Sequence, residues 1–297
     1  AAQAILARVC LSMAGEPLKD VSKFQEAKNW CDSVITSGEH SLAKNYAQIF
    51  INHCQDKYDI KECLWEVEFY GNGVGNSYNE SSKIGVTSGP SCSSISYGTS
   101  YSSMRPTEKL YRLYADTTDF RLNWNICPWY YRNPANPGFL TNGAIDTLPK
   151  INRTSTQIWD RYTGKWYREQ EALNPKSQGN SPTNFPVIRY ADVLLMAAEA
   201  NNKAGNDTKA QGYLNQVRRR AFGDLLHDVT STGSTLYDAI LNERRLELAM
   251  EGERFFDLVR TGKAVSVITN FKANKNEVFP IPQIEVDISG LTQNTGY

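Results

Sequence analysis

The sequence predicts a mainly α-helical protein in which tetratricopeptide-like helical hairpins pack on a loop-rich subdomain with a few short strands. Two observations lead to this fold class. Apolar residues recur at helical spacing near the N-terminus and again from residue 187 onward. Between these regions the chain is dense in Gly, Ser, Asn and Pro, which favour turns and loops. With 297 residues, 40% of them apolar, the chain can bury a sizeable core.

The first predicted hairpin belongs to a helical region over residues 1–61. In residues 2–14 one helical face is apolar, and it carries Ile5, Leu6, Val9 and Met13. Gly15-Glu16-Pro17 then breaks the helix, and the apolar pattern resumes over 21–35 until Ser37-Gly38 stops it. Two amphipathic helices joined by a short break predict a helical hairpin.

Residues 62–186 are predicted to form a loop-rich part. Alternating residues at 62–70 favour a strand. The Gly/Ser/Asn-rich segment 71–103 is a long loop, which is often a functional feature in a compact domain. From 119 to 186 the chain is Pro/Asn/Gly-rich and holds four of the six tryptophans, so we expect loops there with short strands such as 165–167.

Helical periodicity returns over residues 187–260. Two helices starting at about Arg189 and Asp207 predict a second hairpin of about 33 residues, close to the tetratricopeptide period. A third, long helix is predicted over 236–259. The last part, 261–297, is expected to be extended, because its two prolines in Phe279-Pro280-Ile281-Pro282 restrict the backbone.

Composition excludes several classes of function. Lys+Arg and Asp+Glu both number 32, so the chain lacks the basic excess of a nucleic-acid-binding protein. The three histidines are scattered and no CxxC pair occurs, so we expect no zinc site and no cofactor. Six cysteines permit disulfides, for example between Cys54 and Cys63, but buried free thiols are an equally good interpretation.

The chain starts in the middle of an amphipathic pattern, without a leader sequence, and we therefore expect that upstream sequence is missing. No apolar run approaches the roughly 20 residues of a membrane span.

Several motifs resemble those of one family. The segment Val187–Ala200 reads VIRYADVLLMAAEA and closely resembles the RYADVLLMYAEA helix of SusD/RagB-like proteins. Further motifs follow in the family's order: Leu214–Arg218, Glu243–Leu248, Glu251–Arg260, Phe279–Pro282 and Gln293–Tyr297. Two departures are Thr295, where the family usually has Pro, and Thr261-Gly262, where it often has Trp-Gly. The resemblance is strong over 187–297, moderate over 1–70 and weak over 71–186.

The resemblance implies a SusD-like fold and a non-catalytic binding subunit of the outer membrane, exposed at the cell surface of Bacteroidetes-type bacteria. Such proteins capture oligosaccharides, or peptides in some members, and cap a SusC-like TonB-dependent transporter barrel. They attach to the membrane only through a lipid on an N-terminal Cys. None of the six cysteines here matches that position, which agrees with a missing upstream region.

The charged C-terminal motifs are predicted to be structural. Glu243, Arg244, Glu251 and Arg254 could suggest acid–base catalysis, but Arg–Glu pairs three or four residues apart on helices more often join neighbouring elements. We expect the same of Asp257 and Arg260. Arg189 and Asp192 are expected to anchor the second hairpin to the loop-rich part.

The candidate ligand-binding residues lie in the poorly matching middle of the chain. Flat aromatic rings suit the apolar C–H faces of sugars, and amide or guanidinium groups supply hydrogen bonds. The predicted contacts are Trp124, Trp129, Tyr130, Tyr131, Asn125, Arg132 and, more weakly, Trp159. An equally good interpretation is that these rings cover the core beneath loops. Trp166 is expected to pack in the core.

Three other functions stay open from the sequence. An oligopeptide-binding member would use backbone-pairing edges and charged pockets. A glycoside hydrolase would need two carboxylates beside the sugar, and the acids nearest the aromatic cluster are Asp119, Asp146, Asp160 and Glu169. A tetratricopeptide-like adaptor would bind only protein partners.

Overall fold

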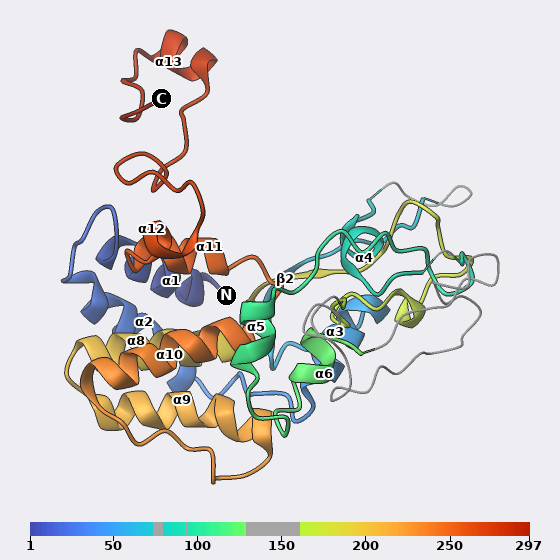
Figure 1. Ribbon diagram of the computed structural model, residues 1–297, viewed down its shortest axis with the longest axis horizontal. Coiled ribbons are helices and arrows are strands. Elements are labelled where there is room, and N and C mark those ends of the chain that lie inside the picture. The colour runs from blue at the N-terminus through green and yellow to red at the C-terminus, as the bar shows by residue number, and fades with distance from the viewer. Residues whose placement is uncertain (74–79, 93, 129–160) are drawn as a thin grey trace.

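Helices dominate the structure, a computed structural model that describes residues 1–73, 80–92, 94–128 and 161–297 (Figure 1). The helices are α1 (Ala2–Ala14), α2 (Lys23–Thr36), α3 (Tyr46–Gln55), α4 (Ile84–Ser88), α5 (Glu108–Leu113), α6 (Leu122–Asn125), α8 (Tyr190–Lys203), α9 (Asp207–Phe222), α10 (Gly233–Glu247), α11 (Arg254–Arg260), α12 (Ala264–Val267) and α13 (Gln283–Ser289). Strands β1 (Cys63–Val67) and β2 (Phe185–Arg189) form an antiparallel pair. The predicted fold class is confirmed.

The helical part is built around α8. This helix packs against α9, α2 and α10, while α1 packs against α2 (Figure 1). Every residue from Tyr190 to Asn201 is buried, so α8 has no solvent face. Its small residues, such as Ala197 and Ala198, let the surrounding helices approach closely. The two predicted hairpins are therefore α1–α2 and α8–α9.

Three sequence-based expectations were wrong in detail. The expected helix over 236–259 is interrupted, since Met250 and Gly252 take positive φ values of 65° and 91° between α10 and α11. Residues 165–167 form a turn rather than a strand, and the second strand is β2. The expected extended segment 261–297 contains two short helices, α12 and α13.

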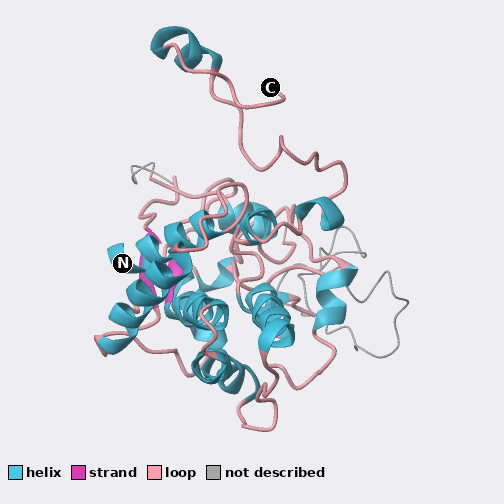
Figure 2. Cartoon of the chain, turned by 90° about the vertical axis from the view of Figure 1, so that its left-hand side faces the viewer, coloured by secondary structure: helices cyan, strands magenta, loops and turns pink. Residues whose placement is uncertain are grey.

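The C-terminal segment projects from the helical part as an arm that ends in α13 (Figures 1 and 2). Three of its apolar side chains, Phe279, Ile284 and Ile288, are 67%, 64% and 75% exposed. None of the helices in the described ranges combines the length and the apolar character needed to cross a bilayer.

The turn between α5 and α6 is tied to the end of α9 by a histidine. His227 Nδ1 lies 2.8 Å from Asp224 Oδ1, and its Nε2 lies 2.9 Å from Asp116 Oδ2. Both nitrogens can donate only when the ring is protonated. The hydrogen bonds to Asp224 and Asp116 raise the pKa of His227 above its ordinary 6.5.

We expect His227→Gln to lower the unfolding midpoint more at about pH 5.5 than at about pH 9. A raised pKa in the folded state gives stability that is fully present below the unfolded pKa and is lost as pH rises through the folded value. Thermal unfolding at several pH values measures the difference. His40→Gln is the control, because that ring contacts the neutral backbone oxygen of Ile60. An equal effect of His227→Gln at both pH values would contradict the prediction.

Candidate functional site

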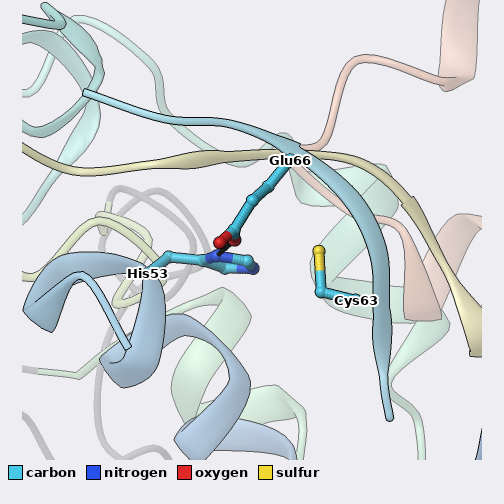
Figure 3. A group of neighbouring side chains, drawn as sticks. All are labelled: His53, Cys63 and Glu66. Carbon is cyan, nitrogen blue, oxygen red and sulfur yellow. Dashed lines mark ion pairs between the residues drawn. The ribbon is translucent and has the colours of Figure 1, made fainter. Parts of the chain in front are cut away.

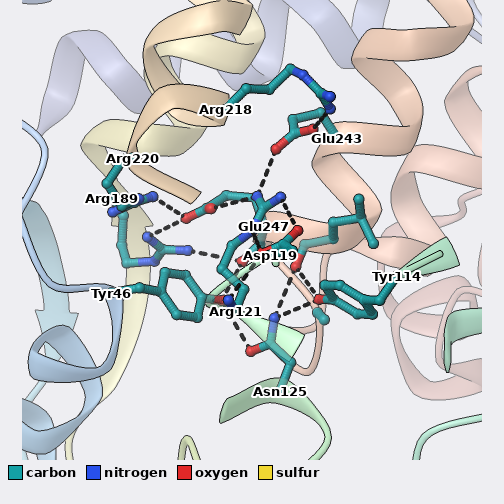
Figure 4. A network of polar contacts seen from close by, with 12 residues as sticks. Tyr46, Tyr114, Asp119, Arg121, Asn125, Arg189, Arg218, Arg220, Glu243 and Glu247 are labelled. Carbon is teal, nitrogen blue, oxygen red and sulfur yellow. Dashed lines mark hydrogen bonds and ion pairs between the residues drawn. The ribbon is translucent and has the colours of Figure 1, made fainter. Parts of the chain in front are cut away.

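The short helix α6 carries the one predicted aromatic contact within the described ranges, Trp124, and internal hydrogen bonds hold this helix in place. Asn125 is fully buried, and its amide lies between Tyr46 and Tyr114 (Figure 4). Its Nδ2 donates to Tyr114 Oη at 2.7 Å and to the Leu246 carbonyl at 3.0 Å, and its Oδ1 accepts from Tyr46 Oη at 3.0 Å. The amide of Asn125, expected to face a ligand, is thus used inside the protein to seat α6.

Arg121, which immediately precedes α6, is completely buried among carboxylates. Its guanidinium binds Asp119 at 2.8 Å, Glu243 at 2.6 Å and Glu247 at 3.0 Å (Figure 4). These bonds connect the start of α6 to two positions one turn apart on α10. Because the Arg121 group is buried and fully paired, it keeps α6 in one position relative to the helical part.

Glu247 is the centre of this ion cluster. Its Oε1 accepts from Arg220 at 2.6 Å and from Arg189 at 3.1 Å, while its Oε2 accepts from Arg121 (Figure 4). Burial opposes ionisation of Glu247, but the three guanidinium groups outweigh burial and hold the pKa of this carboxyl well below its usual range. One carboxylate therefore joins α9, the end of β2, the start of α6 and the end of α10.

The loop-rich part is attached to the same cluster. Arg189 also binds Glu62 at 2.9 Å and Glu251 at 2.7 Å. Glu251 accepts in addition from Lys165 at 2.6 Å, and burial lowers the pKa of Lys165 to about 8. The expectation that Arg189 anchors the hairpin to the loop-rich part is confirmed.

Asp192 binds Arg8 and Arg244 instead, so it joins α8 to α1 and α10. Arg244 also binds Asp257 at 2.9 Å, and Arg260 binds both Glu199 and Asp257. Glu243, Arg244, Glu251, Asp257 and Arg260 are thus structural, as expected, whereas Arg254 has no ion pair among the described residues. Most of these pairs connect residues far apart in the sequence, rather than residues three or four apart on one helix.

Trp124 itself is half-buried and packs against the buried cluster of Tyr46, Ile49, Phe50 and Trp166. Gly164 lies against its indole, where an added Cβ would be 3.4 Å from Cδ2. The indole nitrogen is buried and has no hydrogen-bond partner among the described residues. Trp124 therefore belongs partly to the core, and only part of its ring is accessible to a ligand.

Two segments that are far apart in the sequence, 124–127 and 162–164, meet at α6. Cys127 and Tyr162 form an isolated antiparallel bridge, and Gly164 donates to the Trp124 carbonyl at 2.7 Å. The other predicted contacts lie outside the described residues: Trp129, Tyr130, Tyr131, Arg132 and Trp159. Cys127 and Tyr162, which flank these residues in the sequence, are held close to Trp124 by the bridge.

The other aromatic residues of the loop-rich part include both buried and exposed rings. Trp166 is fully buried between Phe50 and Phe185, with ring centroids 5.9 and 5.6 Å away, so its expected core role is confirmed. Trp65 on β1 is 50% exposed and Tyr101 is 62% exposed. Both add ring surface to the loop-rich part.

A cavity of about 650 Å³ lies between α5, α10 and α11. Its lining combines apolar residues such as Leu110, Leu248 and Leu258 with Arg245 and Arg254. Neither arginine has an ion pair among the described residues, and burial lowers the pKa of both, that of Arg254 to about 10. The lining also includes the carboxylates of Glu253 and Asp257, so the cavity presents charges of both signs. Sequence reasoning missed the cavity because its walls come from α5 and from helices more than 120 residues later.

Two of the four acids considered for glycoside hydrolysis are described. Asp119 is buried and binds the Arg121 side chain with both carboxylate oxygens. Glu169 is exposed and accepts from the Tyr167 hydroxyl. Asp146 and Asp160 lie outside the described residues. Asp119 therefore has a structural role instead of that of a catalytic acid.

All six cysteines are buried and none of them forms a disulfide, so the alternative of a Cys54–Cys63 disulfide was wrong.

The helical hairpins and the loop-rich part joined to them by buried ion pairs define a SusD-like fold. The chain belongs to the SusD family, whose family model matches residues 61–297. A SusD-like protein of Formosa agariphila is 25% identical over 93% of this chain and 60% of its own length.

Solved structures agree with this family. A SusD homolog from Bacteroides thetaiotaomicron superposes with a TM-score of 0.83 at 27% identity, over all of this chain and 63% of that one. A laminarin-binding SusD-like protein gives a TM-score of 0.71 at 29% identity, over all of this chain and 62% of that one. The chain thus spans about 60% of the length of the relatives it matches.

We expect Glu247→Gln to destabilise the fold by about 3–5 kcal/mol, because three buried guanidinium groups lose their shared counter-charge. Urea unfolding measures the change in free energy of unfolding. Asp228→Asn is the control, since its pair with Arg219 lies at the surface, where water screens the two charges and the pair adds little to stability. If both variants unfold within about 1 kcal/mol of the parent, the ion cluster does not have the role assigned to it.

Proposed function

We propose that this protein is a non-enzymatic binding subunit that captures glycans at the cell surface. The observation that carries the proposal is membership of the SusD family over residues 61–297. It is supported by the likeness to a laminarin-binding SusD-like protein at 29% identity. The structural roles of the Asp119, Glu247 and Glu251 carboxylates also favour binding over acid–base chemistry.

The proposed ligand surface starts at Trp124 and continues into residues 129–160, which the Cys127–Tyr162 bridge flanks. The aromatic and basic residues proposed to contact the glycan are Trp124, Trp129, Tyr130, Tyr131, Arg132 and Trp159. Aromatic rings bind sugars through their flat faces, and Arg132 would add hydrogen bonds. Asn125 is excluded from this set, because its amide seats α6.

The partner proposed from family membership is a SusC-like TonB-dependent transporter barrel in the outer membrane. In this arrangement the protein would be held at the surface by a lipid anchor upstream of the present sequence. It would present the oligosaccharide to the barrel. This part of the proposal rests on the family alone.

We expect the protein to bind a neutral oligosaccharide such as a laminarin fragment, and not a mixture of peptides, in calorimetric titrations. Affinity should be modest, because sugar hydroxyls exchange water hydrogen bonds for protein ones at little net gain. A response to peptides alone would replace the proposed ligand class with the oligopeptide alternative. Release of shorter sugars during the titration would reveal a hydrolase.

We expect Trp129→Ala combined with Tyr131→Ala to weaken glycan binding at least tenfold, since aromatic faces supply much of the contact area. Phe120→Ala is the matched control. Its ring is 65% exposed and lies beside α6, but it contacts Gly223 and is not in the proposed set. Unchanged affinity in the double variant, or an equal loss in the control, would remove these rings from the site.

A further inference from the structure

In strand β1 the side chains of Cys63 and Glu66 face the same side, which departs from the regular alternation of side chains along a strand. Cys63 and Glu66 are three residues apart, so in a regular strand they would point to opposite faces. The pairing of β1 with β2 shifts register between Cys63 and Trp65, and again between Trp65 and Glu66. Such irregularities re-aim side chains. Here Cys63 is buried and Glu66 half-buried, while Trp65 between them is exposed.

Both side chains face His53, which comes from the last turn of α3 (Figure 3). His53 is only 2% exposed. Its Nδ1 lies 2.5 Å from Glu66 Oε2, yet neither ring nitrogen has a hydrogen bond of acceptable geometry to any described residue. Buried imidazole nitrogens normally have a partner, because leaving one unsatisfied costs about 1–3 kcal/mol. The ring of His53 thus lies against the Glu66 carboxylate without a well-oriented hydrogen bond to it.

The three groups have the composition and spacing of a metal ligand set. One imidazole nitrogen, one thiol sulfur and one carboxylate oxygen lie within 4.8 Å of one another. Ligands about 2.0–2.3 Å from a tetrahedral Zn²⁺ ion lie roughly 3.3–3.8 Å apart. The three groups are therefore close enough to share one ion, although His53 Nδ1 and Glu66 Oε2, now 2.5 Å apart, would have to separate to admit it.

We propose that His53, Cys63 and Glu66 form a Zn²⁺ site with an open fourth position. Sulfur and imidazole ligands select zinc over calcium or magnesium, which prefer sets made only of oxygen. The charges also balance, because a thiolate and a carboxylate neutralise the two positive charges of the ion. A neutral unit is the form in which an ion is tolerated in a buried place.

The site would have a structural consequence. His53 belongs to α3 and the other two ligands to β1, so a bound ion would fasten the helix to the strand pair. The proposed zinc site does not depend on the proposed glycan surface.

The test is a titration of the chelator-treated full chain with Zn²⁺ and, for spectroscopy, with Co²⁺. We expect one ion per chain, a higher thermal midpoint with Zn²⁺, and a cobalt–thiolate charge-transfer band. The band should disappear in Cys63→Ser and persist in Cys54→Ser. Cys54 is the matched control, because it is another buried free thiol, adjacent to His53, that is not in the ligand set.

A second variant keeps the test decisive if Cys63→Ser fails to fold. Glu66→Gln preserves the side-chain shape and should bind Zn²⁺ at least about tenfold more weakly, with circular dichroism confirming the fold. No binding by the parent chain would overturn the proposal. So would a cobalt–thiolate band that survives Cys63→Ser or disappears in Cys54→Ser.

Discussion

The arrangement of this protein depends on one buried carboxylate. Glu247 accepts hydrogen bonds from three arginines that come from the end of β2, the start of α6 and the end of α9. Without the carboxylate these guanidinium groups would be buried close together with less counter-charge, which is strongly unfavourable. The cluster therefore requires all four elements to meet at one point. The helical frame and the loop-rich part are held in a single geometry as a result.

This constraint also supports the surface proposed for the ligand. The position of α6 is set from beneath by Arg121 and Asn125, both completely buried. Above this base, Trp124 and the bridge between Cys127 and Tyr162 mark the edge of the loop-rich part. A binding surface built on loops requires such a support, because loops have few contacts of their own with which to fix a ring.

The sequence predicted the helical hairpins well and the site only in part. Periodicity located α1–α2 and α8–α9, although Leu6 and Val9 of the predicted apolar face of α1 are exposed and α8 is buried on every side. It missed β2 and the break at Gly252, which depend on partners elsewhere in the chain and on a positive φ. Asn125 was placed with its aromatic neighbours by proximity in sequence, but its partners are about 11, 80 and 120 residues away. Cys63 and Glu66 were not paired, since strand alternation assigns them to opposite faces.

The burial of α8 on every side has a consequence for how this sequence can change. A surface helix accepts most polar substitutions on its outer face, whereas α8 has no such face between Tyr190 and Asn201. Each replacement there must match the volume of the residue it replaces, and Asp192 must also keep two charged partners. The physical constraints on substitution are therefore tighter along this helix than along a helix with a solvent-exposed face.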